Sequence, residues 1–474
     1  MSLDQLRRSF GWSLSEWARL CALVVVLNGP YWAFSFSTFI SRGFISLDGL
    51  LVAILLRNNL RWMVTAVWLS WIIDGVVSSS TTYRFASPID LLRSVAFESE
   101  INWAAFASWS LFLALLPFLV ATLVFMKGKL QAVRPELSLV ALGAIVVLDA
   151  LNGSSMLSRR DVRLVHFNIA GSAAASIANA LLDSGRVESL VQVRLGGGGI
   201  REVSDTVQRV VRDRRTVVYA IVESMGIPVS MPLREHLTQR LLTAGVRERY
   251  DGRVQRVVAI GGTTAGELRR FCGLEGSFRK VTTADGKSCL PTILRDQGWH
   301  TTGVHGFSKG MFLRKNWWPF IGLGQMEFSE ELFKKYPDRC GGAFRGICDR
   351  DAIHEAFQLA QQSQSFSYVL TLNSHLPLDD MYVPRDLADL CLRERVSSAV
   401  CSMMAHLDVT LDAVSTEALA AIDAPVIIVV GDHPPPFLDT GSRKQFVGSE
   451  VPMYILEPKR PRRDGLDQAR TQSP

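Results

Sequence analysis

Four apolar runs in the second half of the chain each lead into a side chain that could bind a metal ion or react. Glu223 follows the run 216–222, Thr264 follows 253–260, His375 follows 366–372, and Asp432 and His433 follow 424–430. Carboxylate oxygens together with an imidazole nitrogen suit zinc or manganese, and magnesium is possible. The sequence therefore predicts one divalent metal ion held by Glu223, Asp432 and His433.

Thr264 could fill a further position at such a metal. It follows Gly261 and Gly262 at the expected start of a helix, where anions and phosphates are favoured. A metal ion would lower the pKa of its hydroxyl and make it nucleophilic. A phosphoryl group is the natural electrophile, because metal and helix terminus both stabilise its charge. We therefore predict Thr264 as metal ligand and catalytic nucleophile, with Thr263 as a supporting neighbour.

Each of these residues also has a purely structural interpretation. Thr264 and Glu267 fit the S/T-x-x-E capping box that begins many helices. Asp432 could cap a turn before three prolines, His375 could be a satisfied loop histidine, and Glu223 could pair with an arginine. These alternatives stay open for each residue taken singly. For all of them to hold together at matching strand ends would be a coincidence, and this favours a site.

The elements that must position these residues follow from the pattern of apolar runs. Uninterrupted runs of strand length are typical of strands buried on both faces of a parallel sheet. Helical patterns at 231–246, 349–364 and 392–417 supply crossover connections between them. Since the carboxyl ends of parallel strands share one edge, where ligands bind, we predict an α/β domain with a mainly parallel sheet over 214–457.

The first third of the chain is strongly apolar. Five apolar segments are present, at 17–36, 40–56, 60–79, 103–126 and 137–152, and the first, third and fourth approach the ~20 residues that cross a bilayer. We therefore predict a polytopic α-helical transmembrane domain of about five helices over 1–152. Basic residues gather in alternate loops, at Arg7 and Arg8, at Arg57 and Arg61, and at Lys127, Lys129 and Arg134. By the positive-inside rule these loops are cytoplasmic, which places the part after 153 outside.

The cysteines indicate the same location. Six of the seven follow residue 153, and an even number at short separations suits disulfides in an oxidising periplasm or extracellular space. Pairing of nearest neighbours (272–289, 340–348, 391–401) is the simplest of 15 connectivities, among which sequence cannot choose. No C-x-x-C pair is present, so a cysteine zinc cluster is excluded.

Charge and composition describe the remaining segments. The net charge of +6 is modest and suggests contact with anionic lipid headgroups, and no aromatic-interleaved basic groove argues for nucleic acid. Residues 153–213 are predicted to form juxtamembrane amphipathic helices and a linker. The polar, proline-punctuated tail 458–474 is predicted to be disordered.

The motifs together resemble a known family. Glu223 after a strand, Gly-Thr-Thr264-Ala, Asn-Ser-His375-x-Pro and Gly-Asp432-His433 resemble the sulfatase-like branch of the alkaline phosphatase superfamily. The whole chain looks like its membrane-anchored transferases, the lipoteichoic acid synthases and phosphoethanolamine transferases. The segment 305–322 is similar to a lipoteichoic acid synthase motif of a histidine, an aromatic-Asn-Arg triplet, an aromatic residue and a glycine, with Phe312 and Leu313 in place of tryptophan and asparagine.

The resemblance implies roles for particular residues. Glu223, Thr264, Asp432 and His433 would hold the metal, and the substrate-binding residues would be His375, Arg314, His305 and Phe312, with Arg314 and His375 on the phosphate. A true sulfatase would have C-x-P-x-R, whereas Cys272 is followed by Gly-Leu-Glu-Gly.

The expected activity is transfer of a phospholipid headgroup, phosphoethanolamine or phosphoglycerol, through a phospho-threonine intermediate. The donor would be a phospholipid, the acceptor a cell-envelope glycan or lipid-linked sugar, and the product diacylglycerol. The chain is expected to cross the bacterial plasma membrane several times, with the catalytic domain in the periplasm or outside the cell. Two alternatives are a membrane-anchored phosphodiesterase or phosphatase, and a non-catalytic envelope assembly protein.

Overall fold

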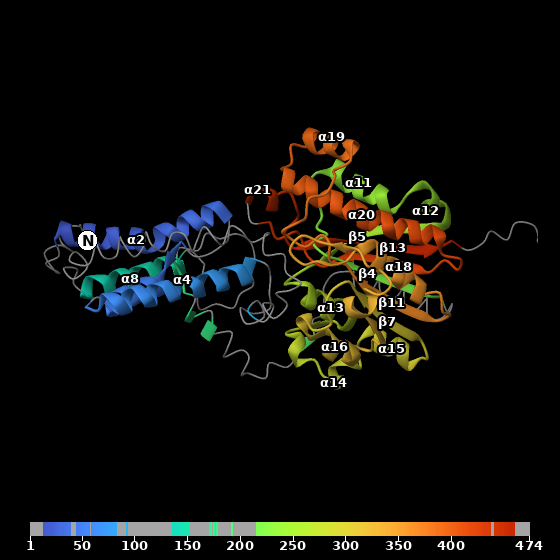
Figure 1. Ribbon diagram of the computed structural model, residues 1–474, viewed down its shortest axis with the longest axis horizontal. Helices are drawn as coiled ribbons and strands as arrows, with labels where there is room; N and C mark the ends of the chain where they lie inside the picture. The colour runs from blue at the N-terminus through green and yellow to red at the C-terminus, as the bar shows by residue number, and fades with distance from the viewer. Residues whose placement is uncertain are drawn as a thin grey trace, which may run out of the picture. The chain divides into compact units, whose positions relative to one another are not determined.

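The computed structural model describes part of the chain (Figure 1). The described residues are 13–38, 44–56, 58–82, 92, 135–151, 170–172, 174–175, 177–178, 191–192, 215–437 and 440–459. The chain divides into two compact units, Met1–Ser189 with Pro436–Lys444, and Leu190–Pro435 with Gln445–Pro474.

The first unit is helical in its described residues. Its described helices include α2 (Leu14–Thr38), α3 (Leu47–Leu55), α4 (Leu60–Thr82), α8 (Pro135–Leu151) and the short α21 (Thr440–Arg443), with the short parallel strands β1 (Ile45–Ser46) and β2 (Ala170–Gly171). Leu27, Trp71 and Leu137 belong to one buried cluster. The Trp71 indole Nε1 donates to the Leu27 carbonyl at 3.1 Å, which joins α4 to α2 inside this unit.

The predicted membrane segments have a mixed outcome. Four of them overlap α2, α3, α4 and α8, while 103–126 lies outside the described residues, as do most of 153–213 and of the tail. Of the helices that the structure describes, none combines the length and the apolar character that a membrane crossing requires.

The second unit is built on a seven-stranded sheet in the order β5-β13-β12-β4-β11-β7-β8. The strands are β4 (Val217–Val222), β5 (Tyr250–Val258), β7 (His300–His305), β8 (Gln325–Glu327), β11 (Ser365–Leu370), β12 (Val426–Gly431) and β13 (Glu450–Pro458). From β12 to β8 all neighbours are parallel, and β13 runs antiparallel to both β12 and β5. The predicted α/β fold with a mainly parallel sheet is confirmed. The sequence patterns missed β7, β8 and β13.

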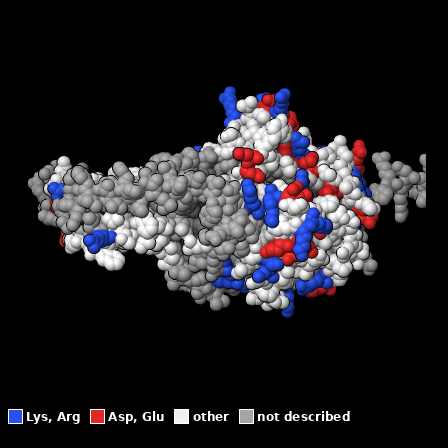
Figure 2. All heavy atoms as spheres, viewed as in Figure 1, with Lys and Arg blue, Asp and Glu red and all other residues white. Residues whose placement is uncertain are grey.

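Helices cover both faces of this sheet. In Figure 1, α11 (Met231–Leu241), α19 (Arg385–Arg393) and α20 (Ser398–Ala420) lie above it, and α13 (Thr263–Cys272), α15 (Leu290–Asp296) and α16 (Arg314–Trp317) lie below. The core below the sheet joins strand residues such as Tyr219 and Tyr368 to Leu268 and Phe271 of α13. On the face shown in Figure 2, basic and acidic side chains of this unit are interspersed.

Two of the predicted helices are broken in the structure. The pattern at 231–246 forms α11 and then α12 (Ala244–Arg249), because the Thr243 side chain accepts a hydrogen bond from Val246 N and starts a second helix. The pattern at 392–417 is divided in the same way between α19 and α20, which Ser397 caps. The third, α18 (Asp349–Leu359), ends earlier than expected.

The register of β4 and β12 builds the edge of the sheet where the site lies. Val222 is paired with Gly431, so Glu223 and Asp432 leave the two strands side by side. A side chain at Gly431 would not fit, since a Cβ there would lie 2.0 Å from the Met225 carbonyl oxygen. The glycine thus lets the chain after β4 pass close to the end of β12.

Three disulfides join nearest neighbours among the cysteines of the second unit. They are Cys272–Cys289, Cys340–Cys348 and Cys391–Cys401. The first connects the last residue of α13 to the residue that precedes α15. The simplest of the predicted connectivities is therefore the one in the structure.

Candidate active site

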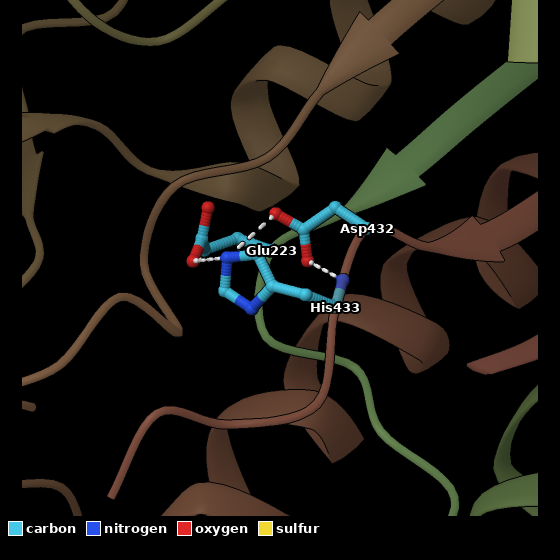
Figure 3. Close-up of side chains that lie close together, drawn as sticks. All are labelled: Glu223, Asp432 and His433. Atoms are coloured by element: carbon cyan, nitrogen blue, oxygen red, sulfur yellow. Dashed lines mark hydrogen bonds and ion pairs between the residues drawn. The ribbon is translucent and has the colours of Figure 1, made fainter. Parts of the chain in front are cut away.

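Glu223, Asp432 and His433 form a candidate metal-binding cluster among the described residues (Figure 3). Ligand atoms of all three lie within 4.8 Å of one another, and all three side chains are buried. His433 Nε2 lies 3.5 Å from Glu223 Oε1 and 3.3 Å from Asp432 Oδ2. The two strand ends predicted to meet do so in the structure.

Backbone hydrogen bonds fix the orientation of these ligands. Asp432 Oδ1 accepts from Ser224 N at 2.8 Å and from His433 N at 2.6 Å, which leaves Oδ2 toward the cluster. Ser224 has a left-handed φ of 55°, a costly conformation for a residue with a side chain. His433 Nδ1 donates to the Pro434 carbonyl at 3.0 Å, so Nε2 is the nitrogen that faces the carboxylates.

The electrostatics of the cluster suit a bound cation. Burial, and then the neighbouring charge of Asp432, raise the pKa of Glu223 well above its ordinary value. Two carboxylates this close and this buried repel each other when both are ionised, and a divalent ion would remove that cost. Two oxygen donors and one nitrogen donor fit zinc or manganese.

The hydroxyl that meets this cluster belongs to Thr263. Its Oγ1 donates to Asp432 Oδ2 at 2.9 Å and lies 3.3 Å from Glu223 Oε2. The residue predicted from the sequence is Thr264, and the hydrogen bonds to the carboxylates come from its neighbour Thr263. The reason is the phase of the helix: Gly262 is the residue before α13, so Thr263 is its first residue and points to the strand ends.

Glu267 is not part of a capping box. The start of α13 has no side-chain cap, and the Glu267 side chain is fully buried. Its Oε1 accepts from Trp318 Nε1 at 2.9 Å and from the Tyr368 hydroxyl at 3.0 Å. Its Oε2 accepts from Arg314 Nε at 3.3 Å and Nη2 at 3.2 Å. Sequence reasoning missed this role because the three donors lie far away along the chain.

Phe312 and His305 lie near Arg314 in the structure. The Arg314 guanidinium is 5.3 Å from the Phe312 ring centre, and Phe312 and Leu313 both have left-handed φ angles, of 52° and 54°. His305, the last residue of β7, is buried and its Nδ1 donates to the Leu370 carbonyl at 3.1 Å. Burial, and then the Arg314 charge, hold the pKa of His305 well below its ordinary value. Glu267, one turn along α13 from Thr263, connects this group to the helix of the cluster hydroxyl.

His375 lies in the loop that follows β11, on another side of the cluster. Its Nδ1 donates to the Leu376 carbonyl at 2.7 Å, and the Phe344 ring packs edge-on at 4.6 Å. Burial, with a smaller contribution from the charge of His433, lowers the pKa of His375 to about 4. The adjacent Ser374 donates its hydroxyl to the Glu223 carbonyl at 2.5 Å, which ties this loop to the cluster.

Comparison with known proteins gives similarities of structure alone. No protein-family model and no curated protein matches the chain. It is similar to the lipoteichoic acid synthase LtaP from Listeria monocytogenes, at 16% identity and a TM-score of 0.39 over 52% of this chain and 65% of that one. It is similar to an alkaline phosphatase superfamily protein from Vibrio parahaemolyticus, at 18% identity and a TM-score of 0.39 over 52% and 60%.

A third similar structure is the zinc complex of the C-terminal periplasmic domain of EcEptC from Escherichia coli, at 13% identity and a TM-score of 0.36 over 52% and 73%. The chain spans less than two thirds of the length of the first two, 65% and 60%.

Proposed function

We propose that the protein is a metal-dependent transferase that moves a phospholipid headgroup, phosphoethanolamine or phosphoglycerol, onto a cell-envelope glycan or glycolipid. One observation carries the proposal: the Thr263 hydroxyl donates to Asp432 at 2.9 Å beside the buried Glu223 and His433. A hydroxyl at the start of a helix, against paired carboxylates and an imidazole, is the arrangement that activates a threonine toward phosphorus.

In the first step Thr263 Oγ1 attacks the phosphorus of the donor. Glu223, Asp432, His433 and Thr263 would hold the divalent ion, which when bound supplies a lower hydroxyl pKa and stabilises phosphate charge. The Thr263 proton passes to Asp432 Oδ2, the oxygen that accepts a hydrogen bond from the Thr263 hydroxyl in the structure. The bond from phosphorus to the diacylglycerol oxygen breaks, and that oxygen takes a proton from solvent. The products are diacylglycerol and a phospho-threonine.

In the second step a hydroxyl of the acceptor sugar attacks the phosphorus of the phospho-threonine, and the bond from phosphorus to Thr263 Oγ1 breaks. The proton of the acceptor hydroxyl leaves to solvent, and Thr263 Oγ1 takes back the proton that Asp432 accepted in the first step. Arg314 and His375 are proposed to contact the phosphate in both steps. Arg314 supplies a positive charge whose direction is set by Glu267. His375 supplies an imidazole that its lowered pKa keeps neutral, and His305 and Phe312 line the side of Arg314.

We propose that the first unit anchors the enzyme in the bacterial plasma membrane, with the second unit in the periplasm or outside the cell. The apolar first third and the three disulfides of the second unit support this location. An enzyme confined to the membrane of its donor meets that donor at a high effective concentration. Confinement therefore gives a physical reason for an anchor.

The test uses vesicles of phosphatidylethanolamine or phosphatidylglycerol with a labelled headgroup, the full chain, Mn²⁺ and a cell-envelope glycan fraction. We expect label in the glycan and one diacylglycerol released for each headgroup transferred. Release of free headgroup alone would identify a phosphodiesterase. Neither product, with the protein folded and metal-loaded, would favour a non-catalytic assembly protein.

A further inference from the structure

Asp349 is a buried carboxylate that the proposed reaction does not use. It is the first residue of α18, and 3% of it is exposed. Its Oδ1 accepts from Leu372 N at 2.7 Å and its Oδ2 from Asn373 N at 3.0 Å. The Thr410 hydroxyl of α20 is a third, longer donor at 3.4 Å. A carboxylate this buried is costly unless its oxygens are satisfied, and two of its donors come from one short loop.

The same loop bonds back to Asp349. The Asn373 side-chain Oδ1 accepts from Asp349 N at 2.6 Å, so the two residues hold each other in both directions. His375 N donates to the Leu372 carbonyl at 2.9 Å, which closes a turn one step further along. The beginning of α18 therefore fixes the conformation of the 371–375 loop.

The opposite side of the 371–375 loop holds the backbone of a metal-ligating residue. Glu223 N donates to Thr371 Oγ1 at 2.9 Å, and Ser374 Oγ donates to the Glu223 carbonyl at 2.5 Å. The loop thus lies between Asp349 on one side and Glu223 on the other. A shift of the loop would move both Glu223 and the imidazole of His375.

We propose that Asp349 is a positioning residue of the active site: by holding the 371–375 loop it sets the backbone of Glu223 and the place of His375. The expected effect on catalysis rests on the proposed function. The expected effect on metal binding through Glu223 rests on the candidate metal-binding cluster alone. Residues that orient metal ligands from behind typically change metal affinity or activity by about 10–100-fold when altered.

The experiment compares Asp349→Asn with Thr410→Val in the full chain. Asparagine keeps the shape but places an NH₂ group against one of the two backbone N–H donors. Thr410→Val removes the longest of the three hydrogen bonds to Asp349, together with the bond from the Thr410 hydroxyl to the His406 carbonyl. We measure Mn²⁺ affinity by titration calorimetry, and kcat and KM for headgroup transfer. We expect Asp349→Asn to weaken Mn²⁺ binding and to lower kcat, each by about tenfold, with KM changed less. Thr410→Val should stay within twofold, and the proposal is overturned if Asp349→Asn does too.

A second variant covers the case in which Asp349→Asn fails to fold. Asn373→Ala removes the acceptor of Asp349 N and leaves the carboxylate and its backbone donors in place. We expect Mn²⁺ affinity and kcat each to fall by about threefold, and values within twofold of wild type would overturn the proposal.

The two readouts separate the failure of this inference from that of the proposed function. Calorimetry with Mn²⁺ needs no substrate. If the variants showed the expected Mn²⁺ affinities but the wild-type chain transferred no headgroup, only the proposed function would be contradicted. A wild-type chain that binds neither Mn²⁺ nor Zn²⁺ would contradict both.

Discussion

At the scale of single residues, Thr263 and Thr264 differ by one position and should differ greatly in function. Thr263→Ala should lower the initial rate of headgroup transfer by at least about 10³-fold, because it removes the attacking oxygen. Thr264→Ala should stay within about tenfold, since the hydrogen bonds to the carboxylates come from Thr263. Rates at saturating donor for both variants and for Thr263→Ser check this.

The opposite result has a clear meaning. If Thr264→Ala abolished transfer while Thr263→Ala retained it, the nucleophile would be the residue favoured by the sequence. Thr263→Ser is the informative control, because it keeps a hydroxyl at the first residue of α13 and should retain measurable activity.

Asp349 should make stability depend on pH. Burial raises the pKa of its carboxyl from 3.8 to about 7, so the folded chain keeps a proton that the unfolded chain loses between these values. The contribution of this group to the free energy of unfolding is fully present below about pH 4. It is lost as pH rises toward 7, by up to about 1.4 kcal/mol per pH unit. Asp349→Asn should remove this slope.

Urea unfolding of wild type and Asp349→Asn at pH 5 and pH 7 measures that difference. Asp379, whose charge also raises the pKa of Asp349, and His406, which faces Asp379, are present in both proteins, so the comparison isolates Asp349. Equal pH slopes in the two proteins would contradict the expectation.

At the scale of elements, Glu267 joins α13 to β11 and to the segment of Arg314 and Trp318. Glu267→Ala leaves the buried Arg314, 2% exposed, without its carboxylate and should lower the free energy of unfolding by about 3–5 kcal/mol. Denaturant unfolding measures this. Asp338→Ala, which breaks an ion pair with side chains 60% and 68% exposed, is the control and should cost less than about 1 kcal/mol. Similar small losses in both would show that the Glu267 network is not structural.

The sequence was informative about the strands that are buried on both faces of the sheet. It was less informative about the outer strands of the sheet and about which side chains of a helix face the site. Continuous apolar runs predicted β4, β11 and β12 and placed Glu223, Asp432 and His433 together, because parallel strands share an edge. Patterns missed β7, whose HTTGVH is mixed in character.

The choice between adjacent threonines needs the phase of a helix, which a glycine turn does not reveal. Glu267 matched a capping motif, but its partners Arg314, Trp318 and Tyr368 come from distant segments that only the tertiary structure brings together. The same holds for Asp349, whose partners lie 23 and 24 residues away.

At the scale of the whole molecule, the second unit has its own sheet, core, disulfides and candidate metal-binding cluster. A fragment of residues 190–474 should therefore fold cooperatively and transfer headgroup from a dispersed short-chain phospholipid to the glycan acceptor about as fast as the full chain. On vesicles its rate should fall by at least about tenfold, because it no longer shares the membrane of its donor. Equal rates on vesicles would contradict the anchoring role, and activity on neither donor would show that the first unit is needed by the catalytic unit itself.

The most direct test of the central claim is peptide mass spectrometry of the full chain after incubation with Mn²⁺ and phospholipid. The Thr263 mechanism predicts an adduct of phosphoethanolamine or phosphoglycerol mass on Thr263, absent from Thr263→Ala and lost when glycan acceptor is added. An adduct on Thr264, or no adduct in a preparation that turns over donor, would contradict it.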